Sequence, residues 1–109
     1  MRKPGSLVIK DASSDEPQGF DWTAWLEELG SGVQISSSTW TITGGDTATA
    51  PVTVLTLHDA SIVTGGLKTQ AYFEAGTHGK KYTVTNRVTT NSTPPVTDER
   101  SFQYLIQAR

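Results

Sequence analysis

Two histidines, His58 and His78, are the residues best suited to acid–base chemistry near neutral pH. The run His58-Asp59-Ala60-Ser61 brings together the three residue types of a serine hydrolase. It does not lie on a nucleophile elbow, and neighbouring side chains on a strand point to opposite faces, so these groups would diverge. We therefore predict that both histidines are loop residues without a catalytic role.

Metal ligands could come from Asp11, Asp15 and Glu16, which lie close together near the start of the chain. They lack the alternating oxygen ligands and the central glycine of a calcium loop. The absence of cysteine excludes thiolate sites and disulfides. The glycine pairs at 44–45 and 65–66 are followed by no Lys-Ser/Thr, as a phosphate loop requires. We predict no catalytic residue, no metal and no cofactor, and hence no enzyme.

The overall charge adds a further exclusion. A net charge of −2 over 109 residues offers no basic stripe to replace the counterions of a nucleic acid. No apolar run approaches the roughly 20 residues that span a bilayer. We expect neither nucleic acid nor a membrane as a partner.

The elements that would position any site are strands. Threonine and valine are frequent, and such β-branched residues favour pleated surfaces. Gly- and Pro-containing breaks at 44–46, 64–66, 76–79 and 91–95 separate alternating segments, which predicts an all-β sandwich. The expected strands are residues 33–42, 49–57, 68–75, 81–90 and 101–109.

Alternation within two of these strands assigns their faces. One set of apolar side chains should point inward from each strand, with Thr, Arg, Ser and Gln on the opposite face. The inward sets are Tyr82, Val84 and Val88 on one strand, and Phe102, Tyr104 and Ile106 on the other.

One helix interrupts the strand pattern near residues 21–29. Apolar residues fall at i, i+3, i+4 and i+7, with Asp21 placed as an N-cap and Gly30 as a C-cap. Two turns are too short to be stable alone, so the helix must dock. It either plugs the end of the β core or presents a tryptophan patch to a partner. The helical face is Trp22, Trp25, Leu26 and Leu29.

Residues 1–19 contain a single short strand candidate, residues 7–9, followed by a polar run. Such a composition buries too little apolar surface to offset its ordering entropy. We predict an N-terminal arm over 1–19 that is loose until a neighbour binds it, and one domain over 20–109.

Two aromatic residues sharpen the fold to an Ig-like β-sandwich. Tyr82 stands near the start of a strand, two residues before inward-facing Val84, as in the tyrosine corner of such domains. Trp40 on an earlier strand is placed to lie between the sheets. The full predicted core is Trp22, Trp25, Leu26, Trp40, Tyr82, Val84, Phe102 and Tyr104.

The order of several short blocks resembles a family of small tailed-bacteriophage virion proteins, the fibre–tail adaptors, with an Ig-like β domain. The similarity spans about residues 10–106, and its last two blocks carry the most weight. The blocks are Asp21-Trp22 with Trp25-Leu26, Ser37-Ser38-Thr39-Trp40-Thr41, Tyr82 through Thr90, and Thr97-Asp98-Glu99-Arg100-Ser101-Phe102.

The last two blocks would be antiparallel strands joined by a loop at 91–96. Arg87 and Arg100 are expected on one side, forming an ion-pair network with Asp98 and Glu99. Exposed pairs contribute only about 0–1 kcal/mol each. Two interpretations therefore stay open: the four charges stabilise the loop, or they are candidate contacts with a partner.

The resemblance implies a non-catalytic structural protein of the virion tail, made in the host bacterial cytoplasm. It would join the fibre to the tail tube or connector, in several copies arranged as a ring. The partners would be other virion proteins, contacted near the arm, the loops at 30–33 and 91–96, and the charged cluster. Alternatives are a capsid-decoration or head–tail neck protein, and a carbohydrate-binding Ig-like module.

Overall fold

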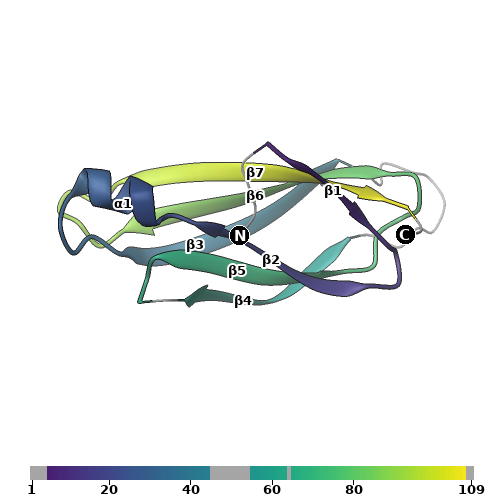
Figure 1. Cartoon of the computed structure of the whole chain (residues 1–109), viewed down its shortest axis with the longest axis horizontal. Coiled ribbons are helices and arrows are strands. Elements are labelled where there is room, and N and C mark those ends of the chain that lie inside the picture. Colours follow the sequence, from purple (N-terminus) through teal and green to yellow (C-terminus); the bar gives the residue numbers. More distant parts are fainter. Residues whose placement is uncertain (1–4, 45–54, 64, 108–109) are drawn as a thin grey trace.

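Two β-sheets and one short helix make up the computed structural model, which describes residues 5–44, 55–63 and 65–107 (Figure 1). The helix lies at one end of the elongated sandwich, whose strands run along its longest axis. The elements are β1 (Leu7–Lys10), β2 (Asp15–Asp21), α1 (Thr23–Leu29), β3 (Ile35–Gly44), β4 (Thr56–Val63), β5 (Lys68–Glu74), β6 (Lys81–Thr90) and β7 (Thr97–Ile106).

The strands pair in the orders β1-β7-β6-β3 and β2-β5-β4. β1 runs parallel to β7, and the other pairs are antiparallel. The prediction of an all-β sandwich with a single short helix is confirmed for the part of the chain that the structure describes.

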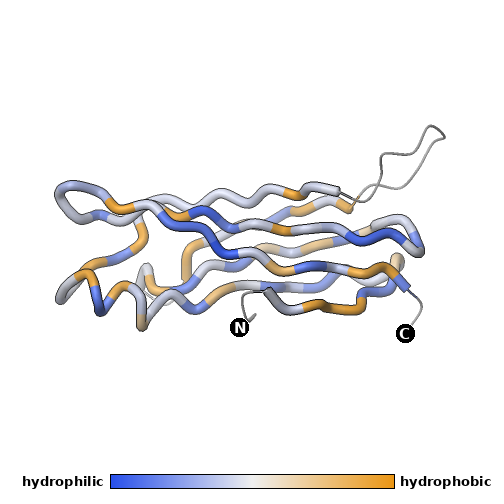
Figure 2. Tube along the Cα trace, turned by 90° about the horizontal axis from the view of Figure 1, so that it is seen from above, coloured by the Kyte–Doolittle hydropathy of each residue, from blue (hydrophilic) through white to orange (hydrophobic). Residues whose placement is uncertain are grey.

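Side-chain alternation on β6 and β7 follows the prediction. Tyr82, Val84 and Val88 are buried on β6, and the threonines between them lie on the outer face. Figure 2 shows that hydrophobic and hydrophilic residues both occur along each of the strands. The inner faces of the two sheets therefore meet in one apolar core, as period-2 patterning requires.

Strand boundaries agree best where alternation is strongest. β6 spans residues 81–90 as predicted, whereas β7 begins at Thr97, four residues before the predicted 101–109. Of the predicted strand 49–57, residues 49–54 lie outside the described residues. β4 instead continues through His58 to Val63, so the prediction that His58 is a loop residue is wrong. His78 does lie in the turn between β5 and β6.

The segment expected to be a loose arm contributes a strand to each sheet. β1 pairs with β7, and β2 pairs with β5 along seven residue positions. Backbone hydrogen bonding does not require apolar side chains, which is why the polar composition was misleading here. Pro17 is tolerated because β2 is an edge strand, and the Gly19 backbone approaches the Thr69 carbonyl so closely that a Cβ would overlap it.

Lys10 anchors the turn between β1 and β2. Its side chain is fully buried, and Nζ donates hydrogen bonds to the carbonyl oxygens of Asp11 (2.9 Å), Ser14 (2.7 Å) and Ala75 (2.8 Å). A buried ammonium is tolerable when its hydrogens find such acceptors. One lysine thus holds the N-terminal strands against the loop after β5.

Helix α1 docks on the end of the β core, which agrees with the interpretation that it plugs this end. The Asp21 carboxylate accepts hydrogen bonds from the Thr23 hydroxyl (2.6 Å) and backbone N–H (3.0 Å). Trp22, at the N-cap position, and Leu26 are buried, whereas Leu29 remains 38% exposed. The predicted N-cap position is therefore off by one residue: the N-cap is Trp22, which makes no side-chain capping hydrogen bond, and Asp21 precedes it.

Two further contacts match the sequence-based expectation of an Ig-like sandwich. The Thr77 backbone N–H donates to the Tyr82 phenol oxygen at 3.0 Å, five residues upstream. Trp40 on β3 stacks on Phe20 of β2 and meets the edge of Phe73 of β5, so its indole lies between the two sheets. Both are features of Ig-like domains, and that finer assignment stays a prediction.

Candidate partner-binding surface

The predicted charged cluster lies near the end of the sandwich that carries α1. Arg87 on β6 and Glu99 on β7 are directly opposite in register, and Arg87 Nη1 lies 3.1 Å from Glu99 Oε2. Their side chains are 58% and 52% exposed on the outer face of the four-stranded sheet. An exposed pair of this kind contributes about 0–1 kcal/mol, so little stability is lost if a partner separates the two charges.

Asp98 is exposed beside this pair and turns back on its own strand. Its Oδ1 accepts a hydrogen bond from the Glu99 backbone N–H at 2.8 Å. The carboxylate therefore shapes the start of β7.

Arg100 does not join Arg87, contrary to the expected one-sided network. Its Nη1 donates to the Asp21 carbonyl oxygen at 2.8 Å, and its guanidinium lies 4.1 Å from the Trp22 ring centroid. Glu99 and Arg100 are consecutive on a strand and so point to opposite faces. Arg100 thus covers the buried indole and holds the start of α1, while Arg87 faces outward.

The two loops expected near partner contacts lie at this same end. Asn91 accepts a hydrogen bond on Oδ1 from the Gln34 N–H (3.0 Å), and its own N–H donates to the Gln34 carbonyl oxygen (2.9 Å). This pair joins the segment after α1 to the β6–β7 loop. We refer to residues 30–34 and 91–96, with Arg87, Asp98 and Glu99, as the helix-end surface.

A pocket of about 560 Å³ opens on the helix-end surface. Its wall includes Leu26 and Glu27 of α1, residues 30–34, and Leu67 before β5. Leu26 and Leu67 make its floor partly apolar, while Glu27 supplies a carboxylate at its side. A pocket with this lining suits an apolar side chain of a partner protein.

A buried polar network supports this end of the molecule. Trp22 Nε1 donates to Thr69 Oγ1 (3.2 Å) and Asn86 Oδ1 (3.1 Å), and the Thr69 hydroxyl donates to the same Asn86 oxygen (2.6 Å). Asn86 Nδ2 donates in turn to Ser38 Oγ and the Thr39 carbonyl oxygen. Because Thr69 and Asn86 belong to different sheets, the network fixes the start of α1 relative to both.

Most of the predicted core lies where the sequence placed it. The core cluster contains Trp22, Leu26, Trp40, Tyr82, Val84, Phe102 and Tyr104, while Trp25 is half-buried and packs against it. Phe20 and Phe73, which sequence reasoning did not select, join this aromatic cluster through ring contacts with Trp40. Phe73 could have been found from the alternation of residues 68–74.

One polar cluster was not predicted, although Asp15 and the pair His58-Asp59 were each considered separately. His58 lies between two carboxylates, with Nε2 2.9 Å from Asp15 Oδ1 and Nδ1 2.9 Å from Asp59 Oδ2. Hydrogen bonds from the imidazole to Asp15 and then Asp59 raise the pKa of His58. This cluster lies on the three-stranded sheet, away from the helix-end surface.

Comparison with known proteins identifies the family to which the chain belongs. Among the described residues, no helix has the length and apolar character needed to cross a membrane. A search of curated proteins finds no match to the chain. Residues 10–104 match the family described as podophage GP4 fiber-tail adaptor protein gp77. Since that match covers most of the sequence, the chain belongs to this family of phage fiber-tail adaptor proteins.

Proposed function

We propose that this protein is a non-catalytic virion component that joins the fibre to the tail tube or connector through the helix-end surface. Its family is one of phage fiber-tail adaptors, which implies contact with other tail proteins and a place in the virion. The observation that carries the proposal is the grouping of two loops, a pocket and an exposed ion pair at one end of a rigid sandwich.

The charges on this surface suit exchange with a partner. Arg87 and Glu99 are more than half exposed and contribute little to stability, so a partner's carboxylate and ammonium can replace their mutual contact at small cost. The adjacent pocket offers apolar burial, which supplies most of the affinity of a protein interface. Charge selects the orientation, and the pocket supplies the binding energy.

Several copies arranged as a ring around the tail axis would follow from this role. A closed ring repeats one contact between neighbours. A contact of ordinary size buries about 800 Å² per partner. Weak contacts become firm when all copies bind one scaffold, because later contacts form within a single assembly. We therefore expect a protein that is monomeric or weakly associated alone.

The tryptophans argue for the adaptor role over a carbohydrate-binding module. Sugar-binding faces use exposed aromatic rings, whereas Trp22 is fully buried, Trp40 is 9% exposed, and Trp25 is packed against the core. No feature of the described residues specifically favours a capsid-decoration or head–tail neck protein over the adaptor.

Swapping the charges of the exposed pair tests the proposal. The double variant R87E/E99R keeps an ion pair within the protein but reverses its direction toward a partner. We expect an unchanged melting temperature and a clear loss of fibres on assembled particles, counted by electron microscopy. K81E, at the opposite end of β6 and exposed, is the matched control and should leave full fibre occupancy.

Two results would contradict the proposal at different levels. Full fibre occupancy with R87E/E99R would move the interface away from the helix-end surface. Normal fibre occupancy on particles that lack this protein altogether would rule out the adaptor role itself.

A further inference from the structure

Three strands of the smaller sheet bring one imidazole and two carboxylates together on its outer face. Asp15 on β2 lies directly opposite Glu74 on the central strand β5, and His58 comes from β4 on the other side. One potential ligand atom from each of the three lies within 4.8 Å of the other two. Residues 43 positions apart in sequence thus converge on one point.

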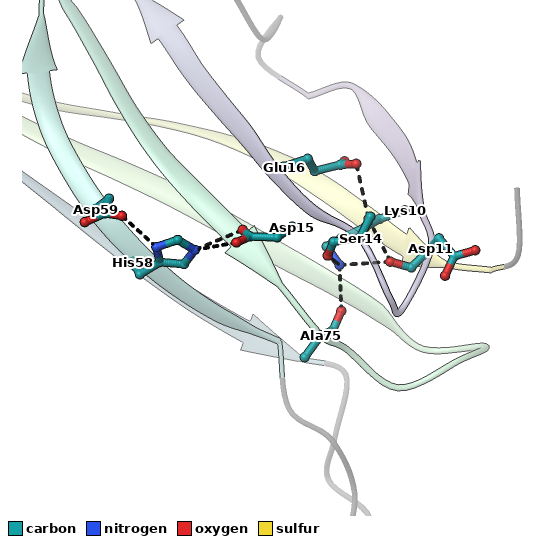
Figure 3. A network of polar contacts seen from close by, with 8 residues as sticks. All are labelled: Lys10, Asp11, Ser14, Asp15, Glu16, His58, Asp59 and Ala75. Atoms are coloured by element: carbon teal, nitrogen blue, oxygen red, sulfur yellow. Dashed lines mark hydrogen bonds and ion pairs between the residues drawn. The ribbon is translucent and has the colours of Figure 1, made fainter.

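His58 is oriented as metal-binding histidines are. Nδ1 lies 2.9 Å from Asp59 Oδ2 (Figure 3). The ring stacks on Tyr72, with centroids 5.5 Å apart. A ligating histidine usually donates its second ring N–H to a carboxylate, which fixes the tautomer and strengthens the other nitrogen as a ligand. In the structure Nε2 lies 2.9 Å from both carboxylate oxygens of Asp15, to which it donates a hydrogen bond. A metal ion would lie between Nε2 and Asp15 in place of that proton.

An irregularity of β4 makes this orientation possible. The pairing of β4 with β5 shifts register between His58 and Ser61, and Asp59 adopts a φ of 51°. On a regular strand, the side chains of residues 58 and 59 would point to opposite faces. The bulge turns the Asp59 carboxylate back beside the imidazole, and such bulges commonly redirect side chains at functional sites.

The two carboxylate ligands are held by their backbone neighbours. Lys10 Nζ donates to the carbonyl oxygens of Ser14 and Ala75, the residues next to Asp15 and Glu74 in sequence (Figure 3). The fully buried ammonium therefore ties the start of β2 to the end of β5. A site whose supporting residues are fixed in this way is preorganised for a ligand.

We propose that Asp15, His58 and Glu74 form a binding site for a divalent transition-metal ion of the zinc class, with Asp59 orienting His58. One imidazole nitrogen and two carboxylate oxygens are ligands that Zn²⁺ accepts. Mg²⁺ and Ca²⁺ prefer sites made of oxygen alone. Three protein ligands leave one tetrahedral position for water or for a group from outside the chain.

Bound metal would join three strands that backbone hydrogen bonds already pair. It would replace the proton that the surrounding carboxylates hold on the imidazole, and it would neutralise part of the negative charge of Asp15, Asp59 and Glu74. This site is independent of the proposed adaptor surface and is contrary to the sequence-based expectation of no metal.

Titration of the full chain with ZnCl₂ tests the site. After treatment with EDTA and dialysis, isothermal titration calorimetry should show saturable binding of one ion per chain, with a rise in melting temperature. H58Q and E74Q should each abolish or strongly weaken this binding. D59N should keep the stoichiometry and lower the affinity by about 10–100-fold, because it changes only the residue that orients the ligand.

H78Q is the matched control, because His78 lies in the β5–β6 turn and outside the cluster. It should bind Zn²⁺ as the unchanged protein does. MgCl₂ and CaCl₂ should bind much more weakly than ZnCl₂. The proposal is overturned if the unchanged protein shows no saturable zinc binding, or if H58Q and E74Q both bind as tightly as H78Q.

Discussion

The core contains two tryptophans that differ in hydrogen bonding within the part of the chain that the structure describes: the indole N–H of Trp22 is bonded, and that of Trp40 is not. Comparing their substitutions therefore measures what this hydrogen bonding contributes to stability. W22F and W40F both replace an indole by a phenyl ring. Trp22 Nε1 donates to Thr69 Oγ1 and Asn86 Oδ1, at 3.2 and 3.1 Å. Trp40 Nε1 is buried and finds no hydrogen-bond partner among the described residues. The two changes should therefore differ in cost although they delete the same atoms.

The difference can be estimated from these contacts. Loss of the Trp22 hydrogen bond costs about 0.5–1.5 kcal/mol. The weaker cation–π contact of Arg100 with a phenyl ring adds up to about 0.5–1 kcal/mol. W40F removes an unpaired buried N–H, whose burial is unfavourable by about 1–3 kcal/mol, and this gain offsets part of its packing loss. Together these contributions predict that W22F destabilises the protein by about 1.5–5.5 kcal/mol more than W40F.

Urea unfolding monitored by far-UV circular dichroism measures both free energies of unfolding on one scale. Equal m-values would show that each variant changes stability and not the extent of unfolding. W25F is a suitable third variant, because Trp25 is only half-buried. The reasoning fails if W40F is as destabilising as W22F, or more so.

Other residues give predictions that the same unfolding assay checks. G19A should be strongly destabilising, because a Cβ there overlaps the Thr69 carbonyl oxygen of the paired strand; a midpoint equal to that of the unchanged protein would contradict this close approach. K10M should cost about 1.5 kcal/mol, since partly buried carbonyl oxygens lose a charged donor. K10M should also speed amide hydrogen exchange in β1, and unchanged exchange would show that Lys10 is not the anchor. Hydrogen bonds from the Thr23 hydroxyl and backbone N–H lower the pKa of Asp21 below its ordinary value of 3.8. Its stabilising contribution is therefore present above that value and lost as pH falls through the lowered pKa. The stability difference between the unchanged protein and D21N should accordingly shrink in strong acid, and a difference that is constant with pH would refute it.

The parts of the fold that the sequence predicted are those with a regular hydrophobic period. β6 alternates from Lys81 to Thr90, so its apolar inward residues Tyr82, Val84 and Val88 were assigned correctly, whereas buried Asn86 and Thr90 were not. Tyr82 and Trp40 could be placed because large aromatic residues on such strands must be buried. The two strands were expected to be antiparallel neighbours, and this pairing places Arg87 opposite Glu99, two of the four charges of the expected network.

Apart from the short candidate at 7–9, the pairing of the N-terminal strands could not be predicted, because most of their residues follow no apolar pattern. β2 is held by backbone pairing with β5, and Lys10 is buried by donating to carbonyl oxygens that only the folded chain assembles. No local pattern identifies such acceptors, which come from residues as distant as Ala75.

The His58 cluster and the position of Arg100 were predicted wrongly, because both depend on where a strand is regular and where it is bulged. On an even strand His58 and Asp59 would diverge, but the bulge after His58 brings Asp59 to the same side. The placement of Arg100 beside Arg87 ignored the alternation that sends Arg100 to Trp22 instead. In both cases, one residue of register changes which groups meet.

A cryo-EM reconstruction of the intact particle tests the adaptor role most directly. The account predicts that density for this sandwich lies between the fibre and the tail, with residues 30–34, 91–96 and the Arg87–Glu99 pair in contact with a neighbouring virion protein. Density on the capsid surface would contradict it, as would a position between fibre and tail in which the α1 end of the sandwich faces solvent.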